Sequence, residues 1–144
     1  MLWTQEVLKD LMEEKIPFNR FLGLKMVRID KEGAELMIPY RSEFIGDMTR
    51  PALHGGLISM LIDTCGGAAT FAQLEVGYRC STVDLTVDYI RPGPLADIYA
   101  KAVVVRRGNR VCLVNMEVTA GEGDEKTIIA QGRGVFNIHA PKTP

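Results

Sequence analysis

The stretch that decides the fold is HGGLISMLID, residues 54–63, in which a histidine and two glycines open an apolar helix and a carboxylate follows two turns later. Paired glycines are poor helix formers, each costing about 1 kcal/mol relative to alanine. An aspartate among Leu, Ile, Met and Cys loses solvation unless it is paired, neutralised or placed in a pocket. Two unfavourable choices this close together indicate a functional site.

The helix that starts at Gly55 is expected to continue to about Leu74 and to be apolar nearly all the way round. A helix with that pattern is buried. The pair Gly66-Gly67 in its middle is expected to let another backbone approach closely, with the same helix of a second subunit as the candidate.

Strands are predicted on both sides of this helix. Their expected ranges are 24–29, 34–39, 82–89, 98–106, 111–119 and 127–138. Alternation within 82–89 places Val83, Leu85, Val87 and Tyr89 on one face. The last four strands are expected to form an antiparallel meander, with a hairpin turn at Gly108-Asn109 and a polar turn at 121–126. Helices on one face of an antiparallel sheet make an α+β domain.

The remaining segments complete a single domain over residues 1–144. Residues 4–16 are predicted to form an amphipathic helix that Thr4 caps and that ends before Pro17. Residues 40–53 are expected to form a long loop, and 140–144 a frayed tail.

Composition excludes several classes of function. With 47% apolar residues, 24% charged residues and a net charge of −1, the 144-residue chain is typical of a soluble globular protein and carries no basic footprint for nucleic acid. Two histidines and three scattered cysteines disfavour a zinc site, and the cysteines favour a reducing compartment. Neither a signal sequence nor a membrane-spanning run is evident, so the expected location is the cytoplasm.

The order of elements and four motifs resemble the hotdog fold, and within it the PaaI-type acyl-CoA thioesterases of the 4-hydroxybenzoyl-CoA thioesterase-like superfamily. The motifs are Pro17-Phe18…Leu22-Gly23, His54-Gly55-Gly56 with Asp63, Thr82-Val83-Asp84, and Arg91-Pro92. The resemblance covers residues 17–138. It implies a long central helix wrapped by a curved antiparallel sheet of about six strands, with a CoA thioester as substrate and no metal or other cofactor.

The resemblance also implies roles for individual residues. Gly55 supplies a backbone N–H to the thioester carbonyl, Asp63 is the catalytic carboxylate, and Thr82 orients the attacking water. His54, Gly56 and the position of Met48 belong to substrate binding. Many relatives have an Asn where this chain has Met48, so a donor is missing or is replaced by Asp47, Thr49 or Arg50.

Chemistry and spacing bear on the same residues independently. The first turn of a helix offers unsatisfied N–H groups to a developing oxyanion, and glycines let a carbonyl approach them. Gly55 and Asp63 are eight residues apart, or about 12 Å along a helix. One chain therefore struggles to supply both groups to one carbonyl, whereas two antiparallel copies across a two-fold axis solve the geometry. The expected active unit is a homodimer, with a tetramer of paired dimers as its extension.

Plainer interpretations remain open from the sequence alone. The glycines relieve crowding at the loop-to-helix junction, and Asp63 is a buried carboxylate satisfied by Ser59 or Thr64. Two other functions also remain open: a hotdog hydroxyacyl thioester dehydratase or hydratase, and a non-catalytic acyl-CoA-binding protein. Whether Asp63 acts as nucleophile or as general base, and which acyl group is bound, stay undecided.

Overall fold

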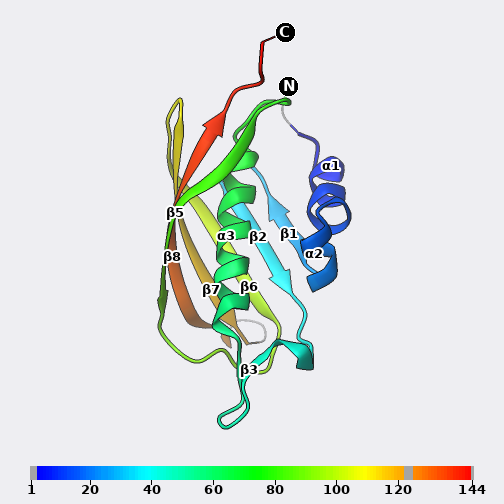
Figure 1. Ribbon diagram of the computed structural model, residues 1–144, viewed down its shortest axis with the longest axis vertical. Helices are drawn as coiled ribbons and strands as arrows, with labels where there is room; N and C mark the ends of the chain where they lie inside the picture. Colours follow the sequence, from blue (N-terminus) through cyan, green and yellow to red (C-terminus); the bar gives the residue numbers. More distant parts are fainter. Residues whose placement is uncertain (1–2, 122–124, 144) are drawn as a thin grey trace.

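A computed structural model describes residues 3–121 and 125–143 of the chain. A long helix, α3 (Gly55–Phe71), lies against a curved six-stranded antiparallel sheet, and a short helical segment at the N-terminus flanks it (Figure 1). This architecture confirms the α+β class and the wrapped central helix that the sequence predicts.

The N-terminal helical segment differs in detail from the single helix expected over 4–16. It consists of α1 (Gln5–Asp10), a π-helical turn η1 (Leu11–Lys15) and α2 (Pro17–Leu22). The Thr4 side chain caps α1 by accepting from the Val7 N–H at 3.2 Å, as predicted. A π turn closes its hydrogen bond over five residues, which a hydrophobic pattern of helical period does not reveal.

The large sheet contains β1, β2, β5, β6, β7 and β8. Their ranges are Lys25–Ile29, Gly33–Ile38, Arg79–Tyr89, Ile98–Arg107, Val111–Ala120 and Thr127–His139. The spatial order is β1-β2-β6-β7-β8-β5, so the expected meander of the last four strands is wrong. Only β6, β7 and β8 form a meander. β5 instead occupies the sheet edge beside β8, and β6 pairs with β2, because residues 90–97 carry the chain from one edge across to the middle.

The connections between the main elements agree only in part with the long loop and the turns expected from the sequence. Residues 40–53 contain a 3₁₀ turn, η2 (Ser42–Phe44), and a small hairpin of β3 (Ile45–Asp47) and β4 (Ala52–Leu53) instead of an unstructured loop. Such short strands lack a long alternating pattern, so only their pairing identifies them. The β6–β7 turn at Gly108-Asn109 is confirmed, with the Gly108 N–H donating to the Val111 carbonyl at 2.8 Å. Part of the expected turn at 121–126 lies outside the described residues.

Helix α3 supplies the centre of the core. Leu61, Ile62, Cys65 and Ala69 are fully buried against the sheet, whereas a stripe that includes Ser59 and Asp63 stays half-exposed. The helix is therefore buried on its sheet side only, which corrects the expectation of burial all round, and it ends at Phe71 instead of Leu74. This half-exposed stripe carries the candidate carboxylate.

Gly66 faces the chain's own sheet, and this corrects its assignment to a second subunit. A Cβ added at Gly66 would lie 2.7 Å from the Phe136 ring, and one at Gly134 would lie 2.5 Å from it. Phe136 is buried and fills the space that these two glycines leave. At Gly67, by contrast, the nearest atom to an added Cβ is 3.7 Å away, an ordinary contact.

These contacts predict opposite effects of two neighbouring substitutions. Gly66→Ala should lower the free energy of unfolding by about 1–2 kcal/mol, since overpacking exceeds the roughly 1 kcal/mol that alanine contributes in a helix. Gly67→Ala should be neutral or stabilising by up to about 1 kcal/mol. Urea denaturation of both variants checks this, and equal stability of the two would contradict the packing described.

Candidate active site

Asp63 is held by a hydrogen bond from the sheet. The Thr82 hydroxyl donates to Asp63 Oδ1 at 2.7 Å, joining α3 to the start of β5. Ser59 and Thr64, the partners considered from the sequence, bond elsewhere: Ser59 to the Gly56 carbonyl and Thr64 to the Met60 sulfur. One carboxylate oxygen is therefore fixed by Thr82, and Oδ2 has no hydrogen-bond partner among the described residues.

A β-bulge brings Thr82 to Asp63. The register of β5 against β8 shifts between Thr82 and Asp84, which inserts Val83 as an extra residue. Val83 is 64% exposed, so it does not share a face with Leu85 and Val87 as alternation predicted. Bulges re-aim side chains next to functional sites. Here the bulge places Thr82 on the helix-facing side together with Leu85 and Val87.

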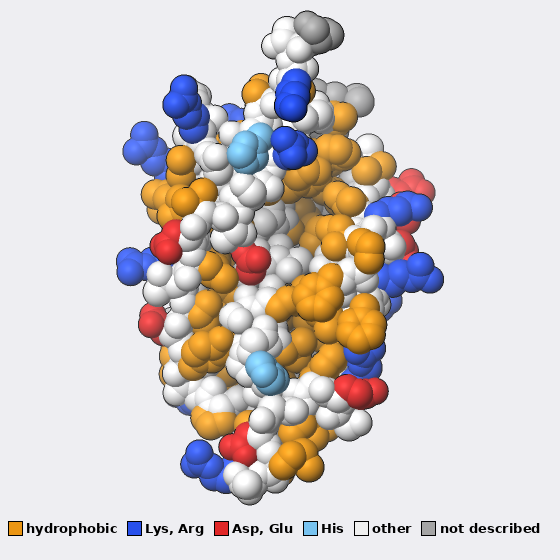
Figure 2. Space-filling model, in the orientation of Figure 1, with side chains coloured by type: hydrophobic (Ala, Val, Ile, Leu, Met, Phe, Trp, Pro, Cys, Tyr) orange, Lys and Arg blue, Asp and Glu red, His pale blue; other side chains and the backbone are white. Residues whose placement is uncertain are grey.

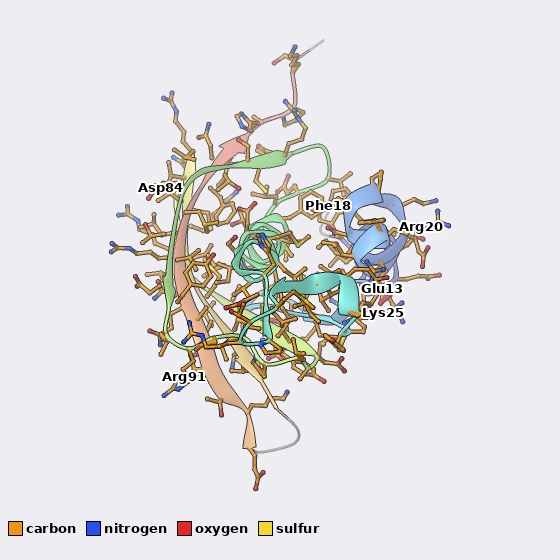
Figure 3. All side chains as sticks on the ribbon, turned by 60° about the horizontal axis from the view of Figure 1, so that its bottom comes forward. Glu13, Phe18, Arg20, Lys25, Asp84 and Arg91 are labelled. Carbon is orange, nitrogen blue, oxygen red and sulfur yellow. The ribbon has the colours of Figure 1, made fainter. Side chains whose placement is uncertain are left out.

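An apolar cavity of about 400 Å³ opens beside this pair. Asp63, Thr82 and Ser81 contribute polar groups to its wall, and most of the remaining wall is hydrophobic. The apolar side chains come from the N-terminal helical segment, from α3 and from the sheet: Leu11, Met12, Ile16, Phe18, Ala68, Phe71 and Phe136. Hydrophobic side chains gather along this side of α3 in Figure 2, and Figure 3 shows Phe18 on the side of α2 that faces α3.

The N-terminal end of α3 carries a second group of candidate residues, separate from Asp63 and Thr82. The His54 N–H donates to the Phe44 carbonyl at 2.8 Å, and His54 Nδ1 accepts from the Gly56 N–H at 2.8 Å. The Leu57 N–H donates to the His54 carbonyl at 3.0 Å. Within the described residues, these bonds occupy the first helical amides except that of Gly55. The amide of Gly55 is therefore left as a donor at this helix end, and its role toward an oxyanion stays a prediction.

Neighbouring strands hold this helix end in place. The Tyr89 hydroxyl donates to the Gly55 carbonyl at 2.8 Å, and a Cβ at Gly46 would lie 2.5 Å from His54 Cα. Because Nδ1 of His54 accepts a hydrogen bond, the neutral ring carries its proton on Nε2. His54 thus acts as the N-cap of α3, and the substrate-binding role expected for it stays a prediction.

The two groups of candidate residues, Asp63 with Thr82 and the N-terminal end of α3, do not meet in one chain. Helix α3 is unbroken from Gly55 to Phe71, so Gly55 and Asp63 are about 12 Å apart along its axis. None of His54, Gly55 and Gly56 lines the cavity beside Asp63. The chain therefore carries two candidate half-sites on one helix, Gly55 at its N-terminal end and Asp63 at its middle.

Met48 does not line the cavity beside Asp63. It is 78% exposed in the turn between β3 and β4. Asp47, one proposed replacement donor, accepts from the Thr49 hydroxyl and from the amides of Arg50 and Thr49, which holds its pKa below the usual range. The hydrogen bonds of Asp47 thus stabilise the turn in which it lies. The substrate-binding role of the Met48 position stays a prediction.

Sequence reasoning missed several residues that the fold brings to the site. In the cavity wall from the N-terminal segment, Phe18 belongs to the motif Pro17-Phe18…Leu22-Gly23, whereas the only sequence signal for Leu11 and Met12 is an amphipathic pattern. Cys80 on β5 also lines the cavity, and burial, with smaller contributions from Cys112 and Asp63, raises the pKa of its thiol to about 11. At neutral pH Cys80 is protonated and does not serve as a nucleophile.

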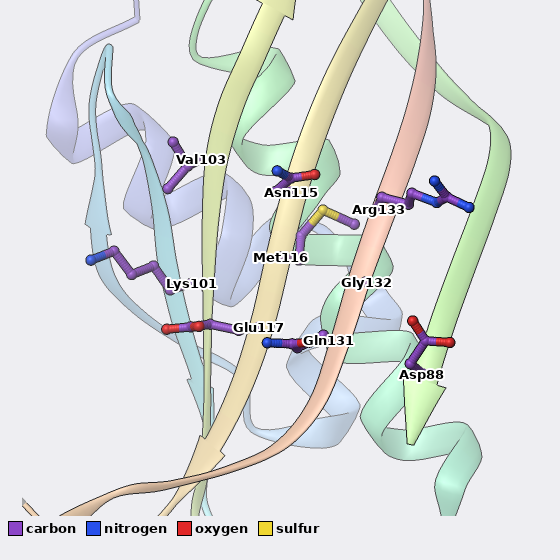
Figure 4. A pocket seen from close by; sticks show the side chains of 9 residues that line it. All are labelled: Asp88, Lys101, Val103, Asn115, Met116, Glu117, Gln131, Gly132 and Arg133. Carbon is purple, nitrogen blue, oxygen red and sulfur yellow. The ribbon is translucent and has the colours of Figure 1, made fainter. Parts of the chain in front are cut away.

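A larger hollow lies elsewhere, on the outer face of the sheet. It measures about 690 Å³ and is lined by polar side chains of β5–β8 such as Asp88, Lys101, Glu117 and Arg133 (Figure 4). The sheet separates it from α3, so it contains none of the candidate residues. Groups of His, Cys, Asp and Glu able to hold a metal ion are absent from the described part of the chain.

Comparison with known proteins decides the family. The model of the thioesterase superfamily matches residues 51–127, which contain α3, β5, β6 and β7. The chain belongs to the thioesterase superfamily. It is 31% identical to the medium/long-chain acyl-CoA thioesterase YigI of Salmonella typhimurium, over 96% of this chain and 97% of that protein.

Solved thioesterase structures share the fold. A thioesterase-superfamily protein from Shewanella oneidensis is 29% identical with a TM-score of 0.78, covering 92% of this chain and 93% of that one. A thioesterase from Haemophilus influenzae, 19% identical, superposes with a TM-score of 0.83 over 97% of this chain and 93% of that one. The expected hotdog thioesterase fold and the assignment as a thioester hydrolase are thereby confirmed. Among the described residues, no helix is long and apolar enough to cross a membrane.

Proposed function

We propose that this member of the thioesterase superfamily hydrolyses acyl-CoA at a site shared between two subunits. The observation that carries the proposal is the pair of half-sites on one unbroken helix: Asp63 with Thr82 beside an apolar cavity, and the unpartnered Gly55 amide about 12 Å away. A two-fold axis that sets two copies of α3 antiparallel brings Asp63 of one subunit to Gly55 of the other.

Each group has a distinct task in the reaction. The Gly55 amide, at the positive end of the α3 dipole, stabilises the oxyanion that forms when the thioester carbonyl is attacked. Thr82 holds one oxygen of Asp63, so the other oxygen faces the substrate. As general base, Asp63 takes a proton from water while the water oxygen adds to the carbonyl. The C–S bond then breaks, and Asp63 returns the proton to the CoA thiolate as CoA and the acid are released. As nucleophile, Asp63 attacks the carbonyl, the C–S bond breaks and CoA leaves as the thiolate, and water then hydrolyses the acyl anhydride to the free acid and the Asp63 carboxylate.

The cavity indicates which part of the substrate lies there. An alkyl or aryl group needs no hydrogen bonds, whereas the pantetheine arm of CoA carries two amides that lose solvation in an apolar wall. The apolar cavity therefore suits the acyl group. Its volume of about 400 Å³ is sufficient for a small or medium acyl or aryl chain. The name of the Salmonella relative, a medium/long-chain acyl-CoA thioesterase, supports the same substrate class.

A thiol-release assay tests the proposal. Acyl-CoAs from C2 to C16 and benzoyl-CoA are incubated with the protein, and free CoA is measured with a thiol reagent. The expected result is CoA release with a maximum among the medium chains. Tight acyl-CoA binding without release would contradict hydrolysis and favour a binding protein. Rapid hydration of an enoyl-CoA without thiol release would favour a hydratase.

A further inference from the structure

Two cavities adjoin along the N-terminal helical segment. The first is the one beside Asp63. The second measures about 430 Å³ and is lined by Trp3, Val7 and Tyr78, among others. Leu11 and Phe71 line both cavities, so these two side chains form the partition between them.

The partition is built from two helix ends. Leu11 opens the π-helical turn, and the Ile16 N–H donates to the Leu11 carbonyl at 3.1 Å across five residues. This closure sets Leu11 and Ile16 on the same side, which a regular helix of 3.6 residues per turn does not do. Both therefore face the first cavity. Phe71 is the last residue of α3, and its ring stacks on Trp3 with centroids 4.7 Å apart.

The distance to the partition limits the acyl chain. Asp63 and Phe71 are eight residues apart on α3, so about 12 Å separates them along the axis. An extended alkyl chain advances a little over 1 Å per bond of about 1.5 Å, so about ten carbons fill this distance. A longer chain meets the side chains of Leu11 and Phe71, each only half-buried and thus able to change rotamer.

The second cavity is chemically suited to the end of such a chain. Its walls include Trp3, Val7 and Tyr78, which offer apolar surface. Its charged members are Asp10, Lys15 and Arg79. Lys15 and Arg79 have long side chains whose charged groups reach solvent while their stems add apolar area, and Asp10 pairs with Lys15 at 3.9 Å. A methyl terminus that passes the partition therefore remains in apolar surroundings.

We propose that Leu11 and Phe71 form a gate between the two cavities and that this gate sets the acyl-chain length the protein accepts. The inference rests on the proposed function, because it places the thioester at Asp63. Chains of up to about ten carbons occupy the first cavity alone. Longer chains require the gate to open into the second cavity.

The test compares Phe71→Ala and Leu11→Ala with a matched control, Phe21→Ala. Phe21 is 68% exposed on α2 and lines neither cavity. The measured quantity is the ratio of kcat/KM for C16-CoA to that for C8-CoA. Both gate variants should raise this ratio about tenfold, since opening the partition removes steric exclusion of the longer chain. The control should keep the wild-type ratio.

Two further measurements distinguish failure of the gate proposal from unfolding of a variant and from absence of hydrolysis. Thermal melting shows which variants are folded. If Phe71→Ala is not folded, the chain-length ratio of Leu11→Ala alone tests the gate. An unchanged ratio in a folded gate variant would overturn the gate. If the wild type releases no thiol from any acyl-CoA, the proposed function fails. Displacement of a fluorescent fatty acid by C8 and C16 acids then tests the gate alone, and an unchanged preference overturns it.

Discussion

Replacing Asp63 with asparagine is expected to lower kcat/KM for acyl-CoA hydrolysis by about a thousandfold. Asparagine neither accepts a proton from water nor attacks a carbonyl, and general-base catalysis typically contributes 10²–10⁴-fold. The Thr82 hydroxyl can still donate to the amide oxygen, so the local structure should persist. Thiol release from a medium-chain acyl-CoA, measured alongside a melting curve, checks this.

A second carboxylate on the same strand as Thr82 serves as the control. Asp84 lies in β5 on the outer side of the sheet, away from α3 (Figure 3). Asp84→Asn removes the same charge from the protein and should retain full activity. If Asp63→Asn kept more than about a tenth of wild-type activity, or if both variants lost activity equally, Asp63 would not be the catalytic carboxylate.

Replacing Gly55 with proline is the second change with a large expected effect. Proline removes the one N–H that the oxyanion requires, and losing such a donor costs about 10²–10³-fold in kcat. The backbone tolerates it, because proline is favoured at the first helical position and His54 before it has φ −59° and ψ 128°. The expected result is a folded protein with kcat about a hundredfold lower.

Gly55→Ala is the matched variant, since it adds a Cβ but keeps the N–H. That Cβ lies 3.4 Å from the Tyr89 ring, close but tolerable with a small shift. Activity of Gly55→Ala should stay within a fewfold of wild type. Equal loss in the two variants would assign the effect to crowding at Gly55 instead of to the missing donor.

The helical stretch from Gly55 was predictable because its pattern is local. Its start and the separation of Gly55 from Asp63 both follow from residue order and helix geometry. The capping of α1 by Thr4 and the turn at Gly108-Asn109 are equally local. These features required no knowledge of which strand pairs with which.

The errors concern long-range pairing and irregular backbone. β5 pairs with β8 because of contacts far apart in sequence, and nothing in residues 82–89 specifies that edge position. The same strand shows regular alternation from Val83 to Tyr89, so the bulge that turns Thr82 toward Asp63 is invisible until the register with β8 is known. The π turn is likewise an irregularity of the backbone, and the apolar cavity that it helps to line forms only when segments far apart in sequence come together.

The most direct test of the shared site combines the two inactive variants. Asp63→Asn and Gly55→Pro chains are mixed, unfolded and refolded together. Half of the resulting dimers are hybrids, and each hybrid contains one site with an intact Asp63 from one subunit and an intact Gly55 from the other. The expected result is recovery of about a quarter of wild-type activity. If the mixture stays as inactive as the separate variants, both groups act within one chain and the two-subunit site is wrong.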